Sequence, residues 1–186
     1  MSEIGVNIHK VYETISLICK GNGRKASDIK LVAACKGVSL ENILEAEAEG
    51  IKIFGENRLQ DATSKIRKAP AHICWHMIGH LQSNKARKAV DLFEMIQSVD
   101  SLQLAEKLES IAEESQKDVE ILLEVNIGKE ENKYGFFEEE IPRAVSRIRS
   151  FQKLKLLGLM TQKDIYINTL FLIQLRMEQL YHCFML

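Results

Sequence analysis

Short apolar runs alternate along the chain with longer stretches whose apolar residues recur at helical spacing. Six apolar runs are predicted as strands, at residues 29–35, 51–54, 74–78, 95–99, 119–125 and 154–159. Helices are predicted at residues 5–20 and then between the strands, at 39–49, 57–68, 82–90, 101–116 and 137–150. Four polar residues are candidate N-caps for these later helices: Ser39, Asn57, Ser83 and Asp100.

Strands that are apolar throughout and joined by helices predict a parallel sheet whose outer face the helices cover. Six strand–helix units of this kind favour a (β/α)8 barrel of the TIM type over an open, doubly wound sheet. A complete barrel has about eight units, so two are missing. The predicted fold is therefore α/β, of the TIM-barrel type, with about six βα units present.

The alternation ends after Leu159, and residues 162–186 form a divergent apolar tail of largely helical pattern. An ending this apolar predicts a truncated or frame-shifted version of a longer chain; the alternative is a helix docked on the sheet. Residues 1–186 are predicted to form a single, incomplete domain, because no low-complexity segment offers a linker. An incomplete barrel would expose a sheet edge prone to association.

Charge and cysteine content exclude several classes of partner. The 25 basic residues nearly balance 26 acidic ones, so no overall field attracts nucleic acid or an acidic membrane. No apolar run approaches the roughly 20 residues that span a bilayer, and residues 1–10 lack a signal sequence, which predicts a cytoplasmic protein. The four cysteines are scattered without a CxxC pair and are interpreted as reduced, mostly buried thiols.

Polar residues follow the predicted strands. In a parallel sheet the carboxyl ends of the strands surround one common mouth, so these side chains are expected to gather there. The residues at the six strand ends are Lys36, Asn57, His80, Ser98, Asn126 and Met160.

Lys36 is the residue in this set with the most distinctive chemistry. At the end of an apolar strand its stem would lie in the core and its ammonium in a confined mouth, where desolvation favours the neutral amine that attacks an aldehyde. The alternative is a lysine that merely reaches water past a strand end. His76 and His80 are separated by a strand end and Gly79, so a helical metal site is not expected. The chain has no GxSxG, P-loop or GxGxxG motif.

The strand-end segments resemble those of the YggS/PROSC family of pyridoxal-phosphate homeostasis proteins. Seven segments carry the resemblance in order, between about residues 5 and 161: LVAACK (31–36), FGENRLQ (54–60), WHMIGHLQSNK (75–85), IQSVDS (96–101), EVNI (124–127), KYGF (133–136) and GLMT (158–161).

This resemblance implies a barrel similar to that of alanine racemase and a pyridoxal 5′-phosphate (PLP) cofactor, held as a Schiff base on Lys36. It further implies that Asn57, His80, Ser98, Asn126 and Met160 line the cofactor pocket. The family has no established turnover and is thought to buffer PLP or deliver it to PLP-dependent apo-enzymes. The chain lacks the family's serine- and glycine-rich loop and arginine–glycine turn, which grip the phosphate. Weak or absent retention of PLP is therefore predicted.

Two other functions remain open. The chain could be a PLP-dependent racemase-like enzyme, although racemisation needs a second base on the opposite face of the cofactor. It could instead be an interaction protein that uses residues 170–186 as a partner helix. A carrier of PLP without turnover of its own is the favoured reading.

Overall fold

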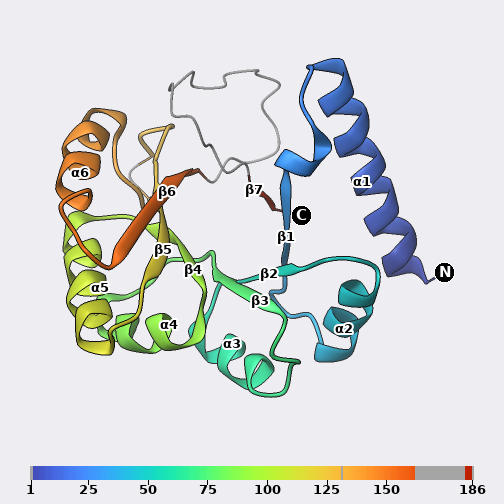
Figure 1. Cartoon of the computed structure of the whole chain (residues 1–186), viewed down its shortest axis with the longest axis horizontal. Coiled ribbons are helices and arrows are strands. Elements are labelled where there is room, and N and C mark those ends of the chain that lie inside the picture. The colour runs from blue at the N-terminus through green and yellow to red at the C-terminus, as the bar shows by residue number, and fades with distance from the viewer. Residues whose placement is uncertain (1, 131, 162–182, 186) are drawn as a thin grey trace.

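The strands form one parallel sheet that curves into part of a barrel (Figure 1). The computed structural model describes residues 2–130, 132–161 and 183–185. Its strands are β1 (Lys30–Ala34), β2 (Ile53–Glu56), β3 (Cys74–Met77), β4 (Met95–Val99), β5 (Val119–Glu124), β6 (Leu154–Met160) and β7 (Cys183–Met185). All the pairings between neighbouring strands are parallel.

Helices lie on the outer side of the curled sheet (Figure 1). They are α1 (Glu3–Gly21), α2 (Leu40–Ala48), α3 (Leu59–Ile66), α4 (Ala86–Leu92), α5 (Leu102–Ser115) and α6 (Ile141–Ile148), with 3₁₀ turns η1 (Ala26–Asp28), η2 (Ser83–Lys85) and η3 (Glu138–Glu140). Helices α2 to α6 each connect two successive strands, while α1 precedes β1. The predicted strand–helix alternation is confirmed.

The strand order decides between the two predicted architectures. It runs β6-β5-β4-β3-β2-β1-β7, so each of the first six strands lies beside its neighbour in the sequence. A doubly wound sheet would reverse its order at a switch point, and β1 to β6 show no such reversal. The winding is therefore that of a (β/α) barrel.

Residues 183–185 correct part of the prediction for the tail. They form β7 alongside β1, with Lys30 opposite Cys183 and Val32 opposite Met185, so the helical pattern predicted there is wrong. Strand β7 also covers the β1 edge that an incomplete barrel was expected to leave open. Among the described residues, β6 pairs only with β5, so its other edge has no neighbouring strand. Residues 162–182 lie outside the described residues, and the nature of the rest of the tail stays a prediction.

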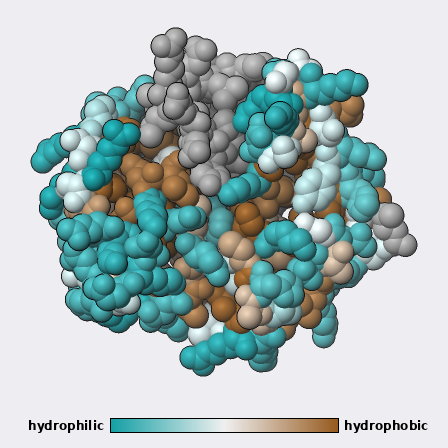
Figure 2. All heavy atoms as spheres, in the orientation of Figure 1, coloured by the Kyte–Doolittle hydropathy of each residue, from teal (hydrophilic) through white to brown (hydrophobic). Residues whose placement is uncertain are grey.

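Alternate residues of each strand point to opposite faces of the sheet. The main core is formed by those that face the outer helices, together with apolar residues of the helices. Phe54 and Trp75 pack there with ring centroids 5.8 Å apart. On the inner face, Met95, Leu122 and Met160 form a second, smaller cluster. Figure 2 shows hydrophobic residues gathered toward the middle of this view and hydrophilic residues around its rim.

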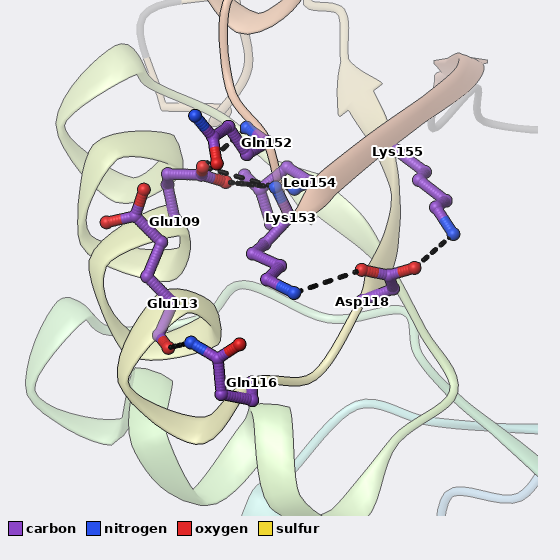
Figure 3. Close-up of polar contacts among 8 residues, drawn as sticks. All are labelled: Glu109, Glu113, Gln116, Asp118, Gln152, Lys153, Leu154 and Lys155. Atoms are coloured by element: carbon purple, nitrogen blue, oxygen red, sulfur yellow. Dashed lines mark hydrogen bonds and ion pairs between the residues drawn. The ribbon is translucent and has the colours of Figure 1, made fainter.

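A buried carboxylate fastens α5 to the start of β6 (Figure 3). Glu109 is only 6% exposed. Its Oε1 accepts a hydrogen bond from the Gln152 backbone N–H at 2.6 Å, and its Oε2 accepts one from the Leu154 N–H at 2.9 Å; the Lys153 N–H donates to both oxygens at 3.2 Å. Asp118 lies nearby between the ammonium groups of Lys153 and Lys155. The edge strand β6 thus enters the sheet at a fixed register.

Helix capping follows the prediction at one site and departs from it at three. The Ser39 hydroxyl accepts from the Asn42 N–H and caps α2 as predicted. The N-caps of α3 and α5 are Arg58 and Ser101, one residue after the predicted Asn57 and Asp100. Ser83 makes no side-chain cap but begins the 3₁₀ turn η2 ahead of α4. Asn57 and Asp100 are therefore released from capping and are available to the strand-end region.

Candidate functional site

Lys36 lies in a tight turn just past β1. Cys35 is 1% exposed, whereas Lys36 and Gly37 are exposed. The Val38 N–H donates to the Cys35 carbonyl at 3.1 Å, and Gly37 has φ +73°, a left-handed conformation that glycine adopts without strain. The confined ammonium expected from the sequence is not found among the described residues, because the turn carries Lys36 beyond the packed end of the strand.

A buried ion pair holds the backbone immediately before Lys36. The Lys65 ammonium, on α3, donates to the Glu56 carboxylate at 2.6 Å and to the Cys35 carbonyl at 2.7 Å. Glu56 is fully buried, and its Oε2 has no hydrogen-bond partner in the described part of the chain. Burial raises the pKa of Glu56, and the bond from Lys65 opposes that shift. Burial likewise raises the pKa of the Cys35 thiol to about 12, which disfavours the nucleophilic thiolate.

A cavity of about 460 Å³ opens beside Lys36 at the carboxyl ends of the strands. A volume of this size is typical of small-molecule sites. The residues around it come from the ends of β1, β2, β3 and β5: Lys36, Asn57, Arg58, Gly79, His80, Glu124, Val125, Asn126, Ile127, Gly128, Glu130, Asn132, Lys133 and Tyr134. The cavity thus brings together four of the six residues selected from the sequence, namely Lys36, Asn57, His80 and Asn126.

Two strand-end loops touch through Gly79. A Cβ built at Gly79 would lie 2.5 Å from the Asn57 carbonyl oxygen, so only glycine permits this close approach. The buried Ser98 hydroxyl donates to the Gly79 carbonyl at 2.6 Å. Ser98 is not among the residues that line the cavity; it fixes the loop that places Asn57 and His80 there.

His80 is oriented from two sides. Its Nδ1 lies 2.8 Å from the Asp100 carboxylate, which also accepts a hydrogen bond from the Ser101 hydroxyl at 3.1 Å. The Tyr134 ring stacks on His80, with centroids 3.6 Å apart and planes 9° from parallel. Because a carboxylate accepts and cannot donate, Nδ1 carries the proton and Nε2 remains for another partner.

Asn126 orders the loop that carries Tyr134. Its side-chain nitrogen donates to the Glu130 carbonyl at 2.9 Å and to the Lys133 carbonyl at 3.1 Å, while its oxygen accepts from the Glu130 N–H at 3.1 Å. Both amide hydrogens are therefore engaged within the protein. Asn126 lines the cavity, but its polar atoms serve the loop.

Met160 lies at the end of β6 and is 5% exposed. It packs in the inner cluster with Met95 and Leu122 and is not among the residues that line the cavity. Its contribution is apolar packing beneath the strand ends.

Glu124 is a cavity residue that the sequence analysis did not select. It is the last residue of β5 and is 7% exposed, and its Oε2 has no hydrogen-bond partner in the described ranges. Burial raises the pKa of this carboxyl, the Asp100 charge raises it further, and His80 opposes both. The signal was its position two residues after Leu122, on the same face of the strand.

His76 belongs to a separate buried group. Its Nδ1 lies 2.7 Å from the Gln97 amide nitrogen and its Nε2 lies 3.4 Å from the Cys74 sulfur. Burial lowers the pKa of His76 to about 4, and the Lys30 charge acts in the same direction. Within residues 2–130, 132–161 and 183–185, no three histidine, cysteine or acidic side chains are arranged to hold a metal ion.

Comparison with known proteins identifies the family. The profile of the family described as alanine racemase, N-terminal domain, matches residues 24–163. The chain belongs to this family. Among the relatives, the pyridoxal phosphate homeostasis protein of Synechocystis is 42% identical over 135 residues, which cover 72% of this chain and 62% of the relative. The protein of the same name from Pseudomonas aeruginosa is 34% identical over 161 residues, 86% of this chain and 70% of the relative.

A solved structure of a related protein supports the family assignment. The structure of PipY from Synechococcus elongatus with PLP bound superimposes with a TM-score of 0.69 at 32% identity, covering 83% of this chain and 72% of PipY. The resemblance to pyridoxal-phosphate homeostasis proteins and the predicted TIM-barrel type of fold are thereby confirmed. The chain spans 62% of the length of its Synechocystis relative. None of the helices in the described part is both long and apolar enough to cross a membrane.

Proposed function

We propose that this protein binds PLP in the strand-end cavity and holds it for use elsewhere in the cell, without turnover of its own. The observation that carries the proposal is the position of Lys36, which lines one cavity together with Asn57, His80 and Asn126. The relatives support it, since two are named for pyridoxal phosphate homeostasis and PipY has a structure with PLP bound. Cytoplasmic apo-enzymes that depend on PLP are the proposed recipients.

The residues present fit the aldehyde and ring portions of PLP. Bound PLP supplies an aldehyde that condenses with amines and an aromatic ring. Lys36 is the amine that would form the covalent bond, and the turn at Gly37 keeps it accessible. Tyr134 stacks on His80 with ring centroids 3.6 Å apart, so the His80 ring is already placed to stack with a planar partner.

The phosphate portion is served less well. The described lining includes no serine or threonine hydroxyl. Arg58, Lys36 and Lys133 supply positive charge, but Lys133 is paired with Glu130 at 2.8 Å. We therefore keep the prediction that PLP is held weakly. Ser98 and Met160 are proposed to support the pocket from behind, through Gly79 and the inner apolar cluster.

Covalent trapping tests the proposal. PLP is added to the purified protein, the mixture is reduced with borohydride, and the modified peptide is identified by mass spectrometry. A reduced adduct on Lys36, absent from Lys36→Ala, is expected. Lys107→Ala, at an exposed lysine of α5, is the matched control and should retain the adduct. Label spread equally over surface lysines, with no loss in Lys36→Ala, would refute the assignment.

A racemase-like activity is the second candidate, favoured by the His80–Asp100 pair. A histidine held at Nδ1 by a carboxylate presents Nε2 as a proton acceptor. Exchange of the α-proton of an amino acid, followed by NMR in deuterated water with PLP present, distinguishes the two functions. We expect no α-proton exchange above that of a control with PLP alone. Exchange that the wild-type protein catalyses and His80→Ala does not would refute the carrier function and indicate catalysis.

A further inference from the structure

Glu124 is a buried acid that the local structure leaves unsatisfied. Glu124 is one of the residues that line the cavity and is 7% exposed, and its buried Oε2 has no hydrogen-bond partner within the described residues. A buried polar atom without a hydrogen-bond partner destabilises a fold, because its desolvation is not compensated. An unsatisfied buried oxygen on a cavity-lining residue needs an explanation, and a ligand group bound beside Glu124 would complete its hydrogen bonding.

The charges around Glu124 select the kind of group. Asp100, whose carboxylate lies 2.8 Å from His80 Nδ1, is a second acid near Glu124: burial raises the pKa of Glu124, and the Asp100 charge raises it further. An anion placed here would face two carboxylates. A protonated nitrogen would instead form a charge-assisted hydrogen bond with Oε2, about twice as strong as a neutral one.

We propose that Glu124 receives a protonated nitrogen in this cavity, either the ammonium group of a small primary amine or the protonated ring nitrogen of PLP. The inference rests on the proposed function and deepens it. Glu124 lines the same cavity as Lys36 and carries the opposite charge, so it is assigned a separate part of the ligand. It also assigns an orientation: the phosphate of PLP would lie away from Glu124 and toward Lys36 and Arg58.

Two probes separate the two sources of the nitrogen. n-Propylammonium carries the ammonium group without the ring, and pyridoxine 5′-phosphate carries the ring without an aldehyde or an amine. Each is titrated calorimetrically into the wild-type protein, Glu124→Gln and Glu120→Gln. Glu120 is the matched control, since it removes the same charge from β5 but lines a different cavity.

Glu124→Gln should weaken one of the two probes by about tenfold or more, as expected for loss of a charged hydrogen bond. Glu120→Gln should change neither by more than about twofold. Loss of n-propylammonium binding assigns an amine site, and this arm needs no PLP, so it stands even where Lys36 trapping fails. Loss of pyridoxine 5′-phosphate binding assigns the ring nitrogen. Unchanged affinity for both probes overturns the inference.

A second measurement uses the wild-type protein alone and covers the case in which Glu124→Gln does not fold. The ¹³C resonance of the Glu124 carboxyl is followed against pH with and without each probe. A bound cation favours the ionised carboxylate, so the saturating probe should move the titration to lower pH. A titration that neither probe moves would contradict the inference.

Discussion

The ion pair behind Lys36 gives the sharpest test of the structure. Lys65→Met removes the ammonium but keeps most of the apolar stem. The variant loses the 2.6 Å bond to Glu56 and the 2.7 Å bond to the Cys35 carbonyl, and it leaves Glu56 buried without its counter-charge. Removing one partner of a buried pair costs about 3–5 kcal/mol. Because Lys65 is 14% exposed and Glu56 can take up a proton, we expect a loss of about 3 kcal/mol in the free energy of unfolding.

The loss should depend on pH, with a defined sign. Burial raises the pKa of Glu56 in the folded protein, so the folded state holds this proton more tightly than the unfolded state. The stability that protonated Glu56 contributes is fully present below the ordinary glutamate pKa. It is lost as pH rises through the pKa of Glu56 in the folded protein. Without Lys65 the pKa rises further. The difference between wild type and Lys65→Met should therefore be smallest in acid and grow toward neutral pH.

Urea unfolding measures both effects. The single tryptophan, Trp75, is 2% exposed in the main core and provides the fluorescence signal. Lys52→Met is the matched control, because Lys52 is 70% exposed in its pair with Glu47 and should change stability by less than about 1 kcal/mol. A Lys65→Met loss no larger than that of the control, or one that does not shrink in acid, would refute the reasoning.

Three further outcomes are expected. Glu109→Ala should lower the free energy of unfolding by about 2–3 kcal/mol in urea titrations, because backbone N–H groups at the start of β6 lose a charged acceptor; Glu109→Gln should lower it less. Gly135→Ala should destabilise by about 2 kcal/mol or more in thermal unfolding, since φ is +115° and the new Cβ would lie 2.8 Å from the Asn126 nitrogen. Cys35 and Cys74, with pKa values raised to about 12 and about 11, should react with iodoacetamide at pH 8 at least about a hundredfold more slowly than in urea; equal rates would contradict the burial of Cys35 and the partial burial of Cys74.

The sheet was predictable because its strands are mostly apolar, with few polar residues interrupting each run. Strand β4 coincides with the predicted residues 95–99, and the other five predicted strands overlap β1, β2, β3, β5 and β6 with ends displaced by at most two residues. Burial on both faces requires continuous apolar runs, which a sequence displays directly. The strand β7 was missed because its three residues continue an apolar stretch of helical pattern. Periodicity alone cannot separate a short strand from a helix there.

The N-caps show where local rules stop being sufficient. Asn57 and Asp100 have the right chemistry for capping, yet Arg58 and Ser101 hold the cap positions. A displacement of one residue decides whether a polar side chain caps a helix or faces the cavity. For Asp100 the difference creates the contact with His80, and for Asn57 it creates a cavity wall.

Glu124 and Lys65 were missed for opposite reasons. Glu124 lies inside the predicted strand 119–125, and the residue selected at this strand end was the next polar one, Asn126. Alternation along β5 from Leu122 was sufficient to place it on the inner face. Lys65 offered no comparable signal: it lies in an amphipathic helix, and its partner carbonyl at Cys35 is 30 residues away in the chain. Only the packing of α3 against the strand ends brings them together. Lys36 could thus be selected as a candidate from its own strand, whereas the group that holds its turn depends on the tertiary structure.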